Sequence, residues 1–333
     1  MSRRTWARLV PIVAALALAT TGCGESSGGG GGSGGGGTIT GLEILVGTAP
    51  GGGFDQTART AAQVMEDAKL ARNVQVSNVP GAGNTVALAR LVNQKGDGKV
   101  MQQMGLSVVG NVYTNKSKAT LNDVTPIARL TQEPEIVVVK ANSPYQTLQD
   151  LTAAWKADPG KVTVGGGGSP GSQDYLTPML MAKQLGMDPT KVNYVAYDGG
   201  GELLTALLGG QVAFGVTGVG ETLQQLEAGK LRALGVSSAE RVSSVDAPTL
   251  KEGGVDLEFI NWRGWIAPGG LDEKEKTALT DLAAKMHDTQ QWKDALAKNG
   301  WTDAYMAADE FATFIKEEDA RIRDVLSQLG LAA

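Results

Sequence analysis

Two glycine-rich segments hold the residues with the clearest potential for binding chemistry. Residues 48–55 read TAPGGGFD and residues 165–172 read GGGGSPGS, and each joins a predicted strand to a predicted helix. Glycine lets the backbone approach a ligand closely, and the first turn of a helix has free N–H groups and a partial positive charge. Together these features bind a carboxylate or another anion without lysine or arginine. One such loop could be an ordinary turn, but two in separate halves of the chain favour an anion site.

Two shorter segments occupy similar places: PGAGN at residues 80–84 and YDGGG at residues 197–201. The candidate ligand-binding residues come from all four segments, and from two positions that directly follow predicted strands. They are Pro50, Gly51, Gly52, Gly53, Phe54, Asp55, Gly81, Gly83, Asn84, Ser107, Gly168, Ser169, Gly171, Ser172, Tyr197, Asp198, Gly199 and Thr217.

Several polar candidates also have purely structural interpretations. Asp55 is most simply a helix N-cap, and the hydroxyls of Ser169 and Ser172 could either cap a helix or donate to a carboxylate. Tyr197 is a donor in a cleft or a half-buried residue at a strand end. We interpret Asp174 and Asp198 as solvated or capping residues.

Composition excludes several classes of site. The chain has one cysteine and one histidine, so it has no disulfide framework, no cysteine-rich zinc site, no multi-histidine metal centre and no ordinary histidine-based triad. Neither long glycine loop continues as Gly-Lys-Ser/Thr, which leaves a Walker nucleotide site unsupported. The formal net charge of −5, without basic runs, argues against nucleic acid. We expect no catalytic residue, no metal and no cofactor.

The first 37 residues predict an export signal and a tether. A basic start leads into an apolar run at residues 9–19 and then TTGC at residues 20–23, the pattern of a signal peptide over residues 1–22. Its end resembles a bacterial lipobox, in which Cys23 would be lipidated. Residues 23–37 would then be a flexible Gly/Ser tether. We expect a lipid-anchored domain on the extracytoplasmic face of the membrane, exported by the general or the twin-arginine route.

From residue 38 the chain alternates strands and helices, which indicates an α/β protein with ligand sites at the carboxyl ends of parallel strands. After residue 268 only helices are predicted. A capping box of Asp272 and Glu275 begins one helix over residues 272–299, and a second helix covers residues 309–329. The predicted strands cover residues 42–46, 73–78, 100–106, 127–130, 135–140, 162–164, 192–196, 212–216 and 231–236.

A set of motifs follows in order along the chain: APGGGxDxxAR at 49–59, VPGAGN at 79–84, GSxGS at 168–172, VxYxG at 195–199, LxGQV at 208–212, RALGV at 232–236 and WxGxxAP at 262–268. With these motifs, the chain from residue 42 to residue 329 resembles the substrate-binding proteins of tripartite tricarboxylate transporters, also called Bug proteins. The chain departs from the family pattern at Asp174, where a histidine is usual.

This resemblance implies a fold like that of type II periplasmic binding proteins, with two α/β lobes joined by two crossover strands. Lobe 1 would comprise residues 38–136 with 262–333, and lobe 2 residues 137–261. The crossovers would be residues 135–140 and 259–266. A small carboxylate would bind in the cleft of a monomeric receptor, which would deliver it to the membrane subunits of a secondary transporter.

Two other functions remain open at the level of sequence. The protein could report its ligand to a sensor partner without transport, or it could be an enzyme that uses the glycine loops for a phosphate. The identity of the ligand also stays open among di- and tricarboxylates, amino acids and aromatic acids, since backbone N–H groups specify a carboxylate and nothing more.

Overall fold

The structure of the chain is a computed structural model that describes residues 38–331. Its strands are β1 (Ile39–Thr40), β2 (Glu43–Val46), β3 (Ala71–Arg72), β4 (Gln75–Asn78), β5 (Val100–Gly105), β6 (Val124–Lys140), β7 (Val164–Gly166), β8 (Tyr194–Ala196), β9 (Phe214–Gly218), β10 (Leu231–Val236), β11 (Ile260–Pro268) and β12 (Thr302–Ala307). Its α-helices are α1 (Gly53–Asp67), α2 (Thr85–Val92), α3 (Leu106–Thr114), α4 (Leu148–Ala157), α5 (Gln173–Gln184), α6 (Gly200–Leu208), α7 (Val219–Glu227), α8 (Glu273–Asp288), α9 (Gln290–Asn299) and α10 (Ala308–Gln328). Short 3₁₀ helices are η1 (Ala82–Asn84), η2 (Leu121–Asp123) and η3 (Pro189–Lys191).

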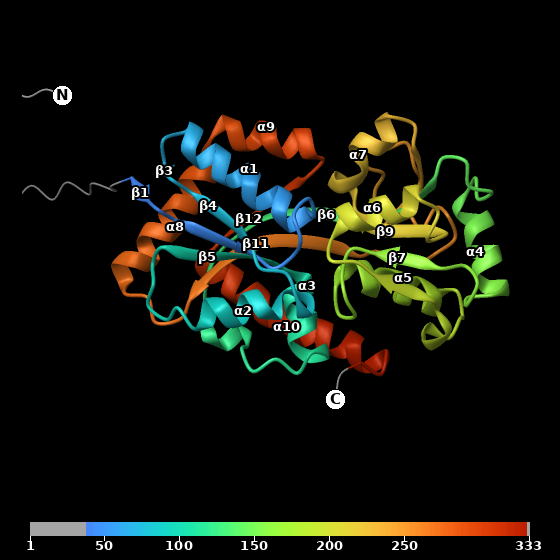
Figure 1. Cartoon of the computed structure of the whole chain (residues 1–333), viewed down its shortest axis with the longest axis horizontal. Coiled ribbons are helices and arrows are strands. Elements are labelled where there is room, and N and C mark those ends of the chain that lie inside the picture. Colours follow the sequence, from blue (N-terminus) through green and yellow to red (C-terminus); the bar gives the residue numbers. More distant parts are fainter. Residues whose placement is uncertain (1–37, 332–333) are drawn as a thin grey trace, which may run out of the picture. The chain divides into compact units, whose positions relative to one another are not determined.

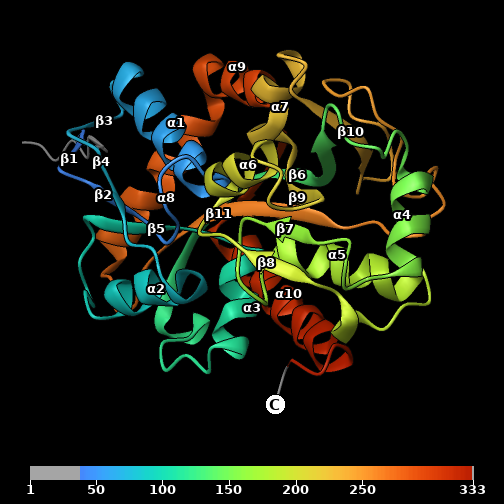
Figure 2. The same ribbon diagram turned by 45° about the vertical axis from the view of Figure 1, so that its right-hand side comes forward.

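Strand β6 organises the main sheet, whose order is β4-β2-β5-β11-β6-β9-β7-β8. Its first part pairs antiparallel with β11 and β12, and its last part pairs antiparallel with β9 and β10. Figure 1 shows β11 beside β6, running from the half that holds β2 and β5 toward the half that holds β7 and β9. The turned view in Figure 2 shows the same continuity. Two long strands therefore connect the halves.

The predicted parallel pairing holds within each half. In one half, β2 pairs parallel with β4 and β5, and in the other, β7 pairs parallel with β8 and β9. The sheet is nevertheless mixed, because β6, β11 and β12 run antiparallel to their neighbours. The run at residues 135–140 was expected to be a buried strand, and Ile136–Val139 are at most 1% exposed.

Three apolar clusters form the core. The largest joins side chains of β2, β5, α1 and α10 with Trp262 and Trp265 of β11. Two smaller clusters cover the faces of the other half. Trp155 and Phe214 pack in one, and Leu203 and Val236 in the other. The exact residue limits of the two lobes stay a prediction, since β6 and β11 contribute to both halves.

Two local expectations are wrong, and one helix has no predicted counterpart. The helix predicted over residues 272–299 begins at its capping box but is broken at Thr289, whose extended backbone separates α8 from α9. The Thr289 hydroxyl accepts from the Trp292 N–H and so begins a new helix. The C-terminal part is also not helical throughout, because β12 pairs with β6. Residues 106–114, rich in β-branched residues, form α3.

Among the helices of residues 38–331, none is both long enough and apolar enough to cross a membrane. The predicted signal peptide, Cys23 and the Gly/Ser tether lie outside the described residues.

Candidate ligand-binding site

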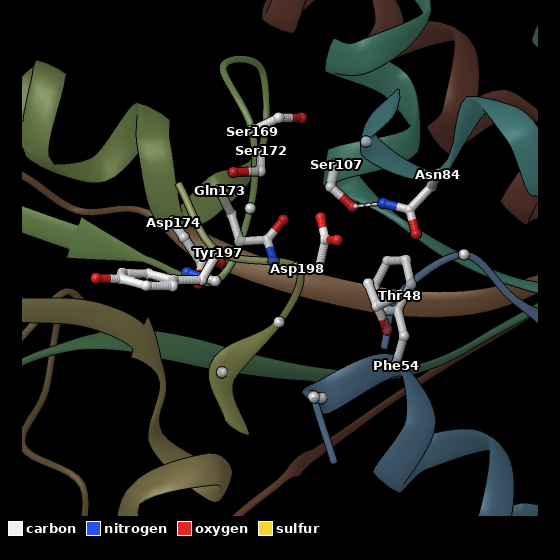
Figure 3. Close-up of a pocket in the computed structure, with 18 of the residues that line it drawn as sticks. Thr48, Phe54, Asn84, Ser107, Ser169, Ser172, Gln173, Asp174, Tyr197 and Asp198 are labelled. Atoms are coloured by element: carbon white, nitrogen blue, oxygen red, sulfur yellow. Dashed lines mark hydrogen bonds between the residues drawn. The ribbon is translucent and has the colours of Figure 1, made fainter. Parts of the chain in front are cut away.

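A small pocket of about 50 Å³ lies at the carboxyl ends of the parallel strands, where the loops of both halves converge. The segments after β2, β4 and β5 approach it from one side, and those after β7, β8 and β9 from the other (Figure 3). It is lined by Gly47, Thr48, Gly52, Gly53, Phe54, Gly81, Gly83, Asn84, Ser107, Asn111, Gly167, Gly168, Ser169, Ser172, Gln173, Asp174, Tyr197, Asp198, Gly199, Gly200, Glu221 and Arg263.

Most of the residues proposed from the sequence gather at this pocket, including both long glycine loops, the 80–84 segment, Ser107 and the 197–199 turn. The residues that do not line it are Pro50, Gly51, Asp55, Gly171 and Thr217. Pro50 and Gly51 are exposed. Gly171 has a φ of +104° and packs directly on Gly110 of α3.

Hydrogen bonds between the two sets of loops close the sides of the pocket. The Ser169 hydroxyl donates to Asn111 Oδ1 over 2.8 Å, and the Ala49 N–H donates to the Asp198 carbonyl over 3.0 Å. Thr114 adds a bond to the carbonyl of Pro170. These hydrogen bonds therefore join the loops of the two halves beside the pocket.

The N–H groups of both long glycine loops are partly occupied by carboxylates of the protein itself. The Gly53 N–H, in the first turn of α1, donates to Glu221 Oε1 of α7 over 2.9 Å. The Gly167 N–H donates to Asp174 Oδ2 over 2.8 Å. The loops do bind carboxylates as their geometry predicts, but in this structure the carboxylates belong to Glu221 and Asp174.

A buried ion cluster lies behind these contacts. Arg263 of β11 is 2% exposed, pairs with Glu133 of β6 and lies 3.7 Å from Glu221. Glu133 also accepts from the Gly220 N–H at the start of α7. A side chain at Gly53 would collide with Arg263, and one at Gly200 with Glu221. Some glycines of these loops are therefore required by the ion cluster as well as by any ligand.

Burial and crowding of like charges change the acidities of this cluster. Burial raises the pKa of Asp174 to about 6, although the hydrogen bond from Gly167 acts to lower it. Burial, with the nearby charge of Asp174, raises the pKa of Glu221 to about 8. Burial also raises the pKa of Glu135 well above its usual range. At neutral pH the cluster therefore holds protons that exposed carboxyls would release.

Several alternatives from the sequence analysis are resolved by position. Ser172 is the N-cap of α5 and also lines the pocket. The N-cap of α1 is Gly52, so Asp55 does not cap the helix. Its carboxylate accepts from Arg59, Asn78 and the Gly51 N–H, and these bonds lower its pKa although burial acts to raise it. The expectation that Asp174 is solvated or caps a helix is wrong, because it is 3% exposed and the N-cap of α5 is Ser172.

The side chains of Tyr197 and Thr217 contact other parts of the protein. Figure 3 shows the Tyr197 ring turned away from Asn84 and Phe54, and it packs on an apolar cluster while its backbone lines the pocket. Thr217 is fully buried and donates to Glu221 Oε2, so it holds that carboxylate in place.

Sequence reasoning missed nine pocket residues, which are Gly47, Thr48, Asn111, Gly167, Gln173, Asp174, Gly200, Glu221 and Arg263. Thr48, Gly167 and Gly200 lie within the glycine-rich segments at residues 48–55, 165–172 and 197–201, so taking every residue of those segments would include them. Gln173 follows the cap of a predicted helix, the position where side chains face a helix-terminal ligand. Glu221 and Arg263 carried no local signal, because their partners are distant in sequence. Within residues 38–331, no three His, Cys, Asp or Glu side chains are placed to hold a metal ion.

Comparison with known proteins places this fold and pocket in a family. The profile described as "Tripartite tricarboxylate transporter family receptor" matches residues 57–331. A UPF0065 protein from the gbd 5′ region of Cupriavidus necator is 31% identical over 325 residues, which cover 96% of each chain. This chain belongs to the family of tripartite tricarboxylate transporter receptors.

Other members of this receptor family are similar over most of the chain. Protein BugT of Bordetella pertussis is 28% identical, over 87% of this chain and 89% of that protein. The solved structure of MatC from Rhodopseudomonas palustris, with bound malate, has a TM-score of 0.77 and 25% identity, over 86% of this chain and 99% of MatC. These likenesses confirm the predicted family and the periplasmic-binding-protein fold with a cleft between two α/β lobes.

Proposed function

We propose that this receptor binds a small carboxylate in the pocket between its two halves and delivers it to the membrane subunits of a tripartite tricarboxylate-type transporter. The observation that carries the proposal is the convergence of both long glycine loops, with the first turns of α1 and α5, on one enclosed pocket. Helix N-termini and glycine backbones bind carboxylates. The malate in MatC is in keeping with a ligand of this class.

We propose that the protein acts as a receptor and not as an enzyme. The alternatives are a receptor that reports to a sensor and an enzyme that binds a phosphate. A transport receptor is required for ligand uptake by cells, whereas a sensing receptor binds the same ligand without affecting uptake. An enzyme of the phosphate class would be stabilised by nucleotides or sugar phosphates and would turn them over.

A thermal-shift screen tests the proposed ligand class. A panel of di- and tricarboxylates, amino acids, aromatic acids and nucleotides is added to the purified domain. At a concentration about 100 times Kd, a bound ligand contributes about 2.7 kcal/mol, which corresponds to a rise in Tm on the order of 5 °C. We expect at least one carboxylate to produce this rise. Stabilisation by nucleotides with no effect of any carboxylate would contradict the proposal.

A pair of glycine variants locates the binding site in the same screen. Gly52 lines the pocket and faces Gly199, so Gly52→Val should abolish the rise in Tm caused by the ligand. Gly160 lies in a turn outside the pocket, and Gly160→Val should keep the full rise. A Gly52→Val protein with an unchanged response would place the site elsewhere.

Membrane attachment through Cys23 is the other part of the proposal. If Cys23 carries the lipid, Cys23→Ala should move the exported protein from the membrane fraction to the soluble extracytoplasmic fraction. Fractionation followed by immunoblotting measures this change. Ser33→Ala, a substitution in the tether, should leave the protein with the membrane. Continued membrane association of Cys23→Ala would rule out the lipid anchor.

A further inference from the structure

The charged side chains that line the pocket are mainly acidic. Asp174, Asp198 and Glu221 line it, and among its lining residues only Arg263 is cationic. The Arg263 guanidinium is paired with Glu133, which does not line the pocket, and is also close to Glu221. One positive charge is therefore shared by two carboxylates, and the lining retains an excess of negative charge.

Asp174 and Glu221 lie close together on one side of the pocket. Both lie beside the backbone at Gly200: a Cβ on Gly167 would be 2.9 Å from Asp174 Oδ2 and 2.6 Å from the Gly200 nitrogen, and a Cβ on Gly200 would overlap Glu221. Each carboxylate is fixed by a backbone donor, Gly167 for Asp174 and Gly53 for Glu221. Both carboxylates of this acidic side are therefore oriented by hydrogen bonds within the protein.

Two buried amide oxygens at the pocket lack a donor. Gln173 is 9% exposed and Asn84 is 4% exposed, and no group of residues 38–331 donates to Gln173 Oε1 or Asn84 Oδ1. Figure 3 shows these side chains on opposite sides of the pocket. Since a buried acceptor without a donor is costly, its presence in a binding pocket indicates a ligand that brings N–H or O–H donors.

We propose that the ligand is an amino carboxylate, whose ammonium group is held on the side formed by Asp174 and Glu221. This inference rests on the proposed function, because it names the class of carboxylate that the same pocket binds. An ammonium has three N–H donors, no acceptor and a positive charge, so it complements the acidic side and the unpaired Gln173 oxygen on the same side of the pocket. A dicarboxylate would instead bring a second negative charge to carboxylates that are already crowded.

The number of protons released or taken up when a ligand binds distinguishes an amino carboxylate from a dicarboxylate that lacks an amino group. With the pKa of Asp174 at about 6 and that of Glu221 at about 8, the pocket holds protons at pH 7. An ammonium favours the ionised carboxylates, so its binding releases protons, whereas a second ligand carboxylate would cause proton uptake. The other groups that act on this pair are Glu133 and Glu135 of β6, Tyr194 of β8 and Arg263 of β11.

Calorimetry with matched ligand pairs tests the proposal. The pairs are aspartate with succinate, glutamate with glutarate, and 5-aminovalerate with valerate, each titrated at pH 7 in phosphate and in Tris, whose ionisation enthalpies differ. In the pair that binds best, we expect the amino member to bind at least tenfold more tightly and to release protons. Asp174→Asn keeps an acceptor for the Gly167 N–H and should weaken the amino member at least tenfold, while its unsubstituted counterpart changes less than twofold. Asp188→Asn, at the exposed N-cap of η3, should change the affinity for neither ligand.

The outcomes separate this inference from the proposed function. A dicarboxylate that binds as tightly as its amino counterpart, or an Asp174→Asn protein weakened equally for both, would overturn the inference and leave carboxylate binding in place. If 1,4-diaminobutane binds and no carboxylate does, the ammonium side stands and the proposed carboxylate receptor fails. If no probe of either kind binds, both fail.

Discussion

Replacing Arg263 with methionine is expected to lower the free energy of unfolding by about 3–5 kcal/mol at pH 8. The substitution keeps much of the side-chain volume but removes the charge that faces Glu133 and Glu221, both almost fully buried. Unpaired buried carboxylates must then either remain charged in a low-dielectric site or take up protons. Urea denaturation followed by circular dichroism measures the loss.

An exposed arginine provides the matched control for Arg263. Arg90 forms an ion pair with Glu43 at the surface, so Arg90→Met should change stability by less than about 1 kcal/mol. The loss in free energy of unfolding caused by Arg263→Met should also be smaller at pH 5, because the carboxyls of Glu133 and Glu221 are more readily protonated there. A loss below about 1 kcal/mol at pH 8 would show that Arg263 does not neutralise the cluster.

The wild-type protein should become less stable as the pH rises from 5 to 8. Glu221 has a folded pKa of about 8 against an ordinary value of 4.5, and Asp174 about 6 against 3.8. The folded state therefore holds these protons more tightly than the unfolded chain. The resulting stability is fully present below the ordinary pKa values and is lost as the pH rises through the folded ones. Between its ordinary pKa and its folded pKa, each group lowers the free energy of unfolding by about 1.4 kcal/mol per pH unit. From pH 5 to pH 8, Glu221 alone lowers it by on the order of 4 kcal/mol.

Variants on one helix test the origin of this pH dependence. Glu221→Gln keeps an acceptor for the Gly53 N–H and presents its NH2 group to the Thr217 hydroxyl, which can accept, and it has no titrating group. It should therefore flatten the profile and be more stable than wild type at pH 8. Glu227→Gln, exposed at the end of the same α7, should keep the wild-type slope. Stability that rises between pH 5 and 8, or an unchanged slope in Glu221→Gln, would contradict the assigned cause.

The glycine loops could be predicted from the sequence because their signal is local. A strand, a run of glycines and a helix are contiguous in the chain, and strands of parallel order place such loops at one edge. The ion cluster could not be predicted in this way. Arg263 stands in the apolar run WRGW and Glu221 in the first turn of a helix, and they meet Glu133 only after β6 and β11 pair.

The extent of β6 shows a second limit of local patterns. The sequence predicts two separate strands, at residues 127–130 and 135–140. Pro134 lies between them and cannot donate a hydrogen bond. The structure continues the strand through Pro134, which lies where β6 passes from pairing with β11 to pairing with β9. A missing donor is tolerated at this point because the pairing partner changes there. That change of partner depends on residues more than 80 positions away.

The pairing of β6 with β11 and β12 has a consequence for the order of folding during synthesis. The core around β2 and β5 includes Trp262, Trp265 and Phe311, which are synthesised more than 200 residues after β2. The clusters around Phe214 and Leu203 draw only on residues 136–255, apart from partly buried Leu257, so their side chains are complete first. The apolar side chains of β2 and β5 therefore stay exposed until the C-terminal part of the chain is available to cover them. Because this closure involves contacts distant in sequence, it is the step at which the emerging chain is most exposed to aggregation.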